Sequence, residues 1–195
     1  MEKDTGVRYE YHDGVIQAMA GGSYDHTTIS GNVYSELRTK LRSRESDGNG
    51  GTTRCVASSE NRKIYIPPKN YFLYPDASAV CGAPHRPPQE PGAVTSPTLI
   101  VEVLSKSTEG KDPESTAGSD KFHLYCLLPT FQEYLLIQQY RVAVEVRTNT
   151  KDGTWKIEAV EGIGQTVELS SLGISFSVDS LYEDTQDSSE FLNKS

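Results

Sequence analysis

Two short runs of strand-forming residues each carry one carboxylate in an apolar context. Asp76 lies in the run 74–80, and Glu102 lies in the run 99–105. Burying a carboxylate among valine, isoleucine and leucine is costly unless a cation or hydrogen bonds compensate its charge. Because the two runs look like neighbouring strands, we expect the two carboxylates to share one metal site.

The donor types of this pair suit a hard divalent cation, Mg²⁺ or Mn²⁺. Mg²⁺ binds proteins through one or two carboxylates and keeps several waters, and Mn²⁺ favours the same oxygen ligands. The backbone carbonyl of Val103 could add a third oxygen. A purely structural interpretation fits the same spacing, with Asp76 capping a turn and Glu102 paired with a buried lysine or arginine.

A hydrolytic site of this kind also needs a cation that is not a metal. A lysine beside the metal can hold the attacking water and stabilise the charge that develops on phosphorus. The candidates are Lys106, Lys111 and Lys121. Lys121 is expected to open a helix over residues 121–128, so that its side chain reaches the end of the Glu102 strand. A lysine in the first turn of a helix is also often solvated.

His26 is the candidate histidine of the site. It stands at the start of a helix that follows Gly21-Gly22 and whose cap is Ser23 or Asp25. The side chain could line the cleft and contact phosphate or water. The alternative is a histidine that only makes hydrogen bonds at the helix end.

The remaining pattern predicts the elements that must position these side chains. An apolar residue recurs at every fourth position of the first helix, at Ile29, Val33, Leu37 and Leu41. A hairpin is expected around Asp13-Gly14, and further strands over 53–58, 63–66, 133–138, 142–147 and 155–160. This order predicts an α/β fold, a mixed sheet with a helix on each face. We expect one domain over residues 1–183 and a disordered, acidic and polar tail over residues 184–195.

Composition limits the class of protein. The chain has 195 residues, 35% hydrophobic and 24% charged, and contains no apolar run near the roughly 20 residues of a bilayer helix. It begins without the apolar segment of a secretory signal, so a cytoplasmic protein without membrane association is expected. The three cysteines (Cys55, Cys81 and Cys126) fit no zinc spacing and are interpreted as buried free thiols in a reducing compartment. The net charge of −8 counts against a simple DNA-binding role.

Several of these motifs, taken in order, resemble the Uma-two family of restriction-endonuclease-like proteins, which belongs to the PD-(D/E)xK nuclease superfamily. The motifs are Tyr11-His-Asp-Gly14, His26, Tyr74-Pro-Asp-Ala-Ser-Ala-Val-Cys81, Val101-Glu-Val-Leu-Ser-Lys-Ser-Thr108, Asp112, Lys121-Phe-His-Leu-Tyr125 and Glu133-Tyr-Leu-Leu136. The likeness runs from about Tyr9 to Tyr182, and the order of the motifs is more specific than any one of them.

The resemblance implies a restriction-endonuclease-like mixed sheet flanked by helices, with Asp76 and Glu102 as the metal carboxylates. In the plain superfamily motif a lysine follows the glutamate by two residues, but Leu104 stands there in this chain. The family pattern carries the lysine on the next helix instead, which matches Lys121. Two departures from the family pattern are Lys106, where proline is usual, and a longer run between Asp112 and Lys121.

Two functional hypotheses follow. The first is a Mg²⁺- or Mn²⁺-dependent endonuclease that hydrolyses phosphodiester bonds in DNA, with Asp76, Glu102, Lys121 and His26 in the site. The second is a non-catalytic binding or regulatory protein that retains the nuclease fold, which the acidic net charge favours. Strand edges and the apolar patch at Phe72-Leu73 further suggest a homodimer.

Overall fold

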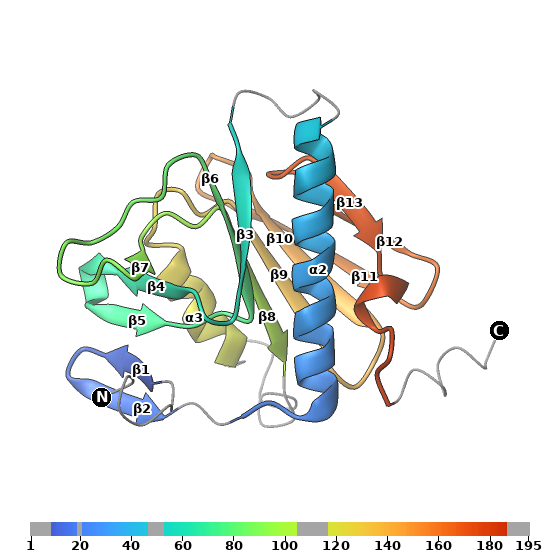
Figure 1. Cartoon of the computed structure of the whole chain (residues 1–195), viewed down its shortest axis with the longest axis horizontal. Helices are drawn as coiled ribbons and strands as arrows, with labels where there is room; N and C mark the ends of the chain where they lie inside the picture. Colours follow the sequence, from blue (N-terminus) through green and yellow to red (C-terminus); the bar gives the residue numbers. More distant parts are fainter. Residues whose placement is uncertain (1–8, 19–20, 47–52, 105–116, 187–195) are drawn as a thin grey trace.

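The computed structural model describes residues 9–18, 21–46, 53–104 and 117–186, and the structural statements below concern these residues (Figure 1). The first half contains β1 (Tyr9–His12), β2 (Val15–Ala18), α2 (Tyr24–Ser46), β3 (Cys55–Ser59), β4 (Lys63–Ile66), η1 (Pro67–Lys69), β5 (Tyr71–Leu73), β6 (Ala77–Cys81) and β7 (Ala93–Val94). The second half contains β8 (Leu99–Leu104), α3 (Ala117–Tyr125), β9 (Glu133–Gln138), β10 (Ala143–Asn149), β11 (Trp155–Glu161), β12 (Thr166–Leu169), β13 (Ile174–Ser177) and η2 (Asp179–Leu181).

The strands form two larger sheets and one hairpin. A six-stranded sheet has the order β11-β10-β9-β8-β6-β3 and is mixed, because β8 and β9 run parallel while its other pairs are antiparallel. A five-stranded sheet has the order β2-β1-β5-β4-β7, and β12 pairs with β13. The predicted α/β class with a mixed sheet and an N-terminal hairpin is therefore confirmed.

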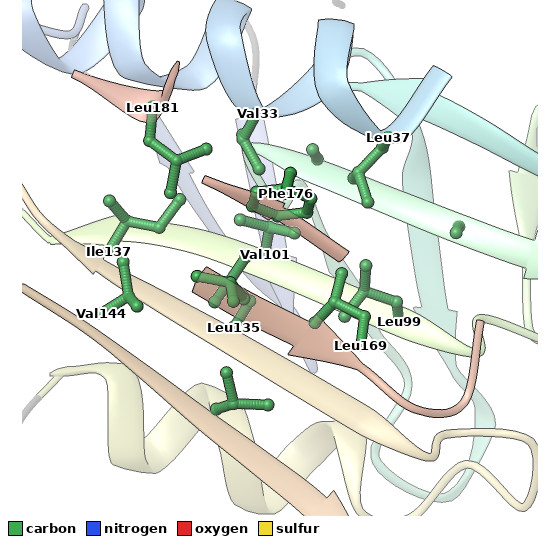
Figure 2. Close-up of a cluster of buried hydrophobic side chains, with 14 of the residues drawn as sticks. Val33, Leu37, Leu99, Val101, Leu135, Ile137, Val144, Leu169, Phe176 and Leu181 are labelled. Carbon is green, nitrogen blue, oxygen red and sulfur yellow. The ribbon is translucent and has the colours of Figure 1, made fainter. Parts of the chain in front are cut away.

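Helix α2 covers one face of the six-stranded sheet. Ser23 caps its start, since the Ser23 Oγ accepts a hydrogen bond from the backbone N–H of His26 at 3.2 Å. All four residues of the predicted apolar stripe are buried. They pack with β8, β9 and the β12-β13 hairpin into one core cluster, part of which is drawn in Figure 2. The predicted stripe thus fixes the rotation of α2 and the position of its first turn.

Helix α3 lies on the other face, where the five-stranded sheet also packs. Phe122 and Tyr125 are buried in a second cluster with Ile100 and Leu104 of β8 and with residues of β4, β5 and β9. The helix begins at Ala117, four residues before the predicted start, so Lys121 lies in its second turn. Phe122 and Tyr125 nevertheless face the core as expected, and they hold the helix against β8.

The interpretation of the cysteines as three free thiols is wrong. Cys55 and Cys81 form a disulfide, because the antiparallel register of β3 and β6 places them directly opposite each other. Cys126 is free and exposed rather than buried. The cysteine count therefore no longer supports a reducing compartment.

Two smaller expectations are also corrected. Leu73 is fully buried and Phe72 is half-buried, so this pair is not the exposed patch that suggested a homodimer. Thr185 is buried, and the backbone N–H of Gln186 donates to Asp25 of α2 at 2.7 Å, so the expected disorder does not begin at residue 184. Residues 187–195 lie outside the described residues, as do Lys106, Lys111 and Asp112. Within the described ranges, no helix combines the length and apolarity that a bilayer crossing requires.

Candidate functional site

Strands β6 and β8 bring Asp76 and Glu102 together. The two strands are antiparallel neighbours, and their last pair at this end is Ala77 with Val101. Asp76 immediately precedes β6 and Glu102 follows Val101 on β8, so one further step of the same register sets them opposite each other. Directly opposed residues of an antiparallel pair project to the same side of the sheet. The negative charge of Asp76 acts on Glu102 accordingly, since it helps to raise the pKa of the Glu102 carboxyl group.

Both oxygens of Asp76 are engaged by the protein. The His26 Nε2 lies 2.9 Å from Asp76 Oδ1, and the backbone N–H of Val103 donates to Asp76 Oδ2 at 2.7 Å. His26 comes from the first turn of α2 and Val103 from β8, so a helix and a strand together orient the carboxylate. Each carboxylate oxygen carries two lone pairs, and one hydrogen bond leaves room for a further donor atom or ion.

Glu102 is buried, with 8% of the residue exposed. The Tyr125 hydroxyl donates to Glu102 Oε1 at 3.2 Å, and the Lys121 Nζ lies 3.7 Å from Glu102 Oε2. Burial raises the pKa of Glu102 to about 7, against the lowering effect of the Lys121 ammonium. The protein alone therefore compensates the charge of this carboxylate only in part.

Lys121 reaches the site from α3. Burial by itself would lower the pKa of its amine, but the carboxylates of Glu102 and Glu10 outweigh burial and raise the pKa, which keeps the group a cation. Leu104, which occupies the position of the lysine in the plain superfamily motif, is buried against α3. The structure thus brings Asp76, Glu102, Lys121 and His26 close together, through the contacts of His26 with Asp76 and of Lys121 with Glu102.

Glu10 is a member of this cluster that sequence reasoning missed. It lies on β1, and its Oε1 is 2.8 Å from the Lys121 Nζ. In the sequence, the only hint of a role for Glu10 is its position between Tyr9 and Tyr11 on a short strand. That alternation is typical of a solvated hairpin and does not by itself indicate a functional site. The position becomes informative only once β1 is seen to pair with β5, a contact between segments about sixty residues apart in sequence.

The donor set fits a divalent ion bound mainly through water. In the part of the chain that the structure describes, no three histidine, cysteine, aspartate or glutamate side chains are grouped closely enough to hold a metal alone. Asp76 and Glu102 offer carboxylate oxygens on adjoining strands, and the charge of Glu102 is undercompensated. Mg²⁺ needs only one or two carboxylates because it retains several waters. The residues present therefore suit Mg²⁺ or Mn²⁺ better than a metal that requires a full protein cage.

Comparison with known proteins identifies the family of the chain. Residues 1–179 match the model of the Uma2 family, described as "Putative restriction endonuclease". Two uncharacterized proteins of Synechocystis sp. (strain PCC 6803) are similar: one is 34% identical over 93% of this chain and 86% of its own length, and the other is 29% identical over 89% and 90%.

A solved structure shares the fold. It is described as a putative nuclease belonging to DUF820 from Anabaena variabilis, with a TM-score of 0.62, 18% sequence identity and 91% of each chain covered. At this level of identity the likeness concerns the fold alone. The family model, in contrast, spans nearly the whole chain and includes all five residues of the cluster. The chain therefore belongs to the Uma2 family.

Proposed function

We propose that this protein is a divalent-metal-dependent nuclease that hydrolyses phosphodiester bonds in DNA. The observation that carries the proposal is the convergence of Asp76 and Glu102 on adjoining strands, with the Lys121 ammonium 3.7 Å from Glu102. Two carboxylates and one ammonium in a largely buried site are a costly arrangement for stability alone. The same groups are well suited to phosphoryl chemistry.

Each side chain has a role that follows from its contacts. Asp76 and Glu102, with the carbonyl of Val103, would hold Mg²⁺ or Mn²⁺. When bound, such an ion supplies Lewis acidity to a phosphoryl oxygen and lowers the pKa of a coordinated water. The Lys121 ammonium would stabilise negative charge on the phosphate. His26 fixes the orientation of Asp76, and the Tyr125 hydroxyl does the same for Glu102.

DNA is the proposed substrate because of the family. The model that matches residues 1–179 is described as "Putative restriction endonuclease", and the similar solved structure is described as "a putative nuclease". The net charge of −8 opposes tight sequence-independent binding to DNA, which relies on lysine and arginine. We therefore expect weak binding to DNA without a divalent ion.

The proposal is tested with supercoiled and single-stranded DNA in the presence of Mn²⁺. The wild type should cleave, Asp76→Ala and Glu102→Ala should be inactive, and Glu161→Gln serves as the matched control. Glu161 pairs with Arg141 at 3.2 Å on the exposed edge strand β11, away from the site. Equal cleavage by the wild type and both site variants would indicate a contaminating nuclease and remove the proposal.

A non-catalytic binding protein is the second candidate, and one observation favours it. In the structure both proposed metal carboxylates already have protein partners. His26 and Val103 contact Asp76, and Lys121 contacts Glu102. Such a closed network can persist without metal. Calorimetric titration separates the candidates: absence of Mg²⁺ and Mn²⁺ binding, with Glu102→Gln changing only stability, would favour the binding protein.

A further inference from the structure

We propose that Glu10 is a positioning residue that holds the Lys121 ammonium in the site. This inference deepens the proposed function and rests on it for the role of Lys121 in cleavage. Among the described residues, the carboxylate oxygen nearest to the Lys121 Nζ belongs to Glu10, at 2.8 Å, whereas Glu102 Oε2 is 3.7 Å away. The direct hydrogen-bonding partner of the lysine is therefore on the N-terminal hairpin and not on the metal-binding strand.

Glu10 is itself held firmly enough for this role. It is the buried residue of β1, with 8% of its surface exposed. Its Oε1 also lies 3.5 Å from the backbone N–H of Tyr74, two residues before Asp76, and its Oε2 lies 3.3 Å from the His12 Nε2. The His12 ring in turn stacks on Tyr71, with centroids 4.8 Å apart. Both oxygens of the carboxylate thus have partners from β1 and the segment after β5.

The pairing of β1 with β5 fixes the hairpin that carries Glu10. Tyr11 is opposite Phe72 and His12 is opposite Tyr71 in this antiparallel pair. The hairpin turn at Asp13-Gly14 has positive φ at both residues, the conformation of a tight two-residue turn. The hairpin is therefore part of the five-stranded sheet, and its carboxylate arrives at the lysine from a rigid element.

The charges explain why Lys121 needs this partner. A lysine side chain has four rotatable bonds and loses considerable rotamer freedom when it is fixed. A divalent cation on Asp76 and Glu102 would cancel the attraction of Glu102 for the ammonium and add like-charge repulsion. Glu10 is not one of the proposed metal ligands, so its negative charge stays available to the ammonium. It can therefore keep the helix-borne Lys121 close to the metal carboxylates.

The first experiment uses the metal-free full chain and needs no activity. Urea unfolding in EDTA is measured for the wild type, Glu10→Gln, Lys121→Met and the double variant. We expect the double variant to lose clearly less stability than the sum of the two single losses, because both substitutions break the same contact. Additive losses would overturn the inference. Glu161→Gln combined with Lys121→Met is the matched control and should be additive, because Glu161 is on β11 and pairs with Arg141.

The second experiment separates positioning from general structure. In single-turnover DNA cleavage with Mn²⁺, Glu10→Gln should lower the rate about 10-fold or more while Mn²⁺ affinity stays within about 2-fold. In the Lys121→Met background the same substitution should change the rate less than about 2-fold. An equal loss in both backgrounds, or a parallel loss of Mn²⁺ affinity, would overturn the inference. If the wild type does not cleave, the proposed function fails and the unfolding cycle alone decides the role of Glu10.

Discussion

The burial of Glu102 makes a quantitative prediction for the metal-free protein. Its pKa is about 7 in the folded chain, against an ordinary value of 4.5. Since the folded state holds this proton more tightly than the unfolded state, the stability contributed by the protonated carboxyl is fully present below pH 4.5 and is lost as the pH rises through 7. This difference between the two pKa values corresponds to about 3 kcal/mol in the free energy of unfolding, because each pKa unit is worth about 1.4 kcal/mol.

The perturbation that isolates this effect is Glu102→Gln, which removes the titrating group and keeps the shape of the side chain. Urea unfolding in EDTA is compared for the wild type and the variant near pH 5 and near pH 8. The wild type should lose about 2–3 kcal/mol more than Glu102→Gln between the two conditions. Carboxylates that do not interact with Glu102 titrate equally in both proteins, so the comparison cancels them.

Glu161→Gln is the control, because Glu161 is exposed and lies on β11. Its pH dependence should follow that of the wild type. Identical pH profiles for the wild type and Glu102→Gln would refute the reasoning, since they would mean that the Glu102 carboxylate is ionised in the fold at no cost. Addition of Mn²⁺ near pH 8 should restore stability to the wild type and not to Glu102→Gln.

Three further predictions concern neighbouring contacts. The disulfide closes a loop over a sequence separation of 26, so Cys55→Ser/Cys81→Ser should cost about 3–4 kcal/mol in urea unfolding. Cys126→Ser should cost almost nothing, and an unfolding midpoint that does not respond to reductant would contradict the pairing. Glu133 is fully buried and accepts hydrogen bonds from the hydroxyl groups of Thr148, Ser170 and Ser171, so Glu133→Ala should cost about 2–4 kcal/mol and Glu133→Gln less, by the same assay. Tyr125→Phe should destabilise the metal-free protein by about 1–2 kcal/mol near pH 8, and no loss in thermal or urea unfolding would mean that the hydroxyl does not hold Glu102.

Local patterns in the sequence predicted the parts of the fold that depend on local periodicity. The apolar stripe from Ile29 to Leu41 marked the buried face of α2, and Asp13-Gly14 marked the hairpin turn. The Asp76 and Glu102 strands were predicted as neighbours because a loop long enough to reverse the chain separates them. Their antiparallel pairing follows from that connection, so this half of the site was available from the sequence.

The rest of the site depends on pairings between distant segments. Glu10 enters the cluster because β1 pairs with β5, and no periodicity in either segment specifies that partner. The Cys55–Cys81 disulfide depends on the register of β3 with β6, which a count of cysteines does not give. The start of α3 was placed too late because the preceding polar residues carry no apolar repeat.

The contact between His26 and Asp76 illustrates the same limit at the level of one side chain. The sequence offered two roles for His26, a helix-end hydrogen bond or a place in the cleft. In the structure its backbone N–H takes part in the Ser23 cap, and its ring reaches Asp76. The ring reaches Asp76 because the first turn of α2 lies beside the residue that precedes β6, and only the packing of the helix on the sheet reveals this contact.

Binding of Mn²⁺ to the purified chain, measured by isothermal titration calorimetry, tests the shared-ion geometry most directly. The wild type and Glu161→Gln should bind about one ion per chain, and Asp76→Ala and Glu102→Gln should each weaken binding about 10-fold or more, because either change removes half of the carboxylate pair. Unchanged binding in both site variants, or no binding by the wild type, would contradict a divalent ion shared by Asp76 and Glu102.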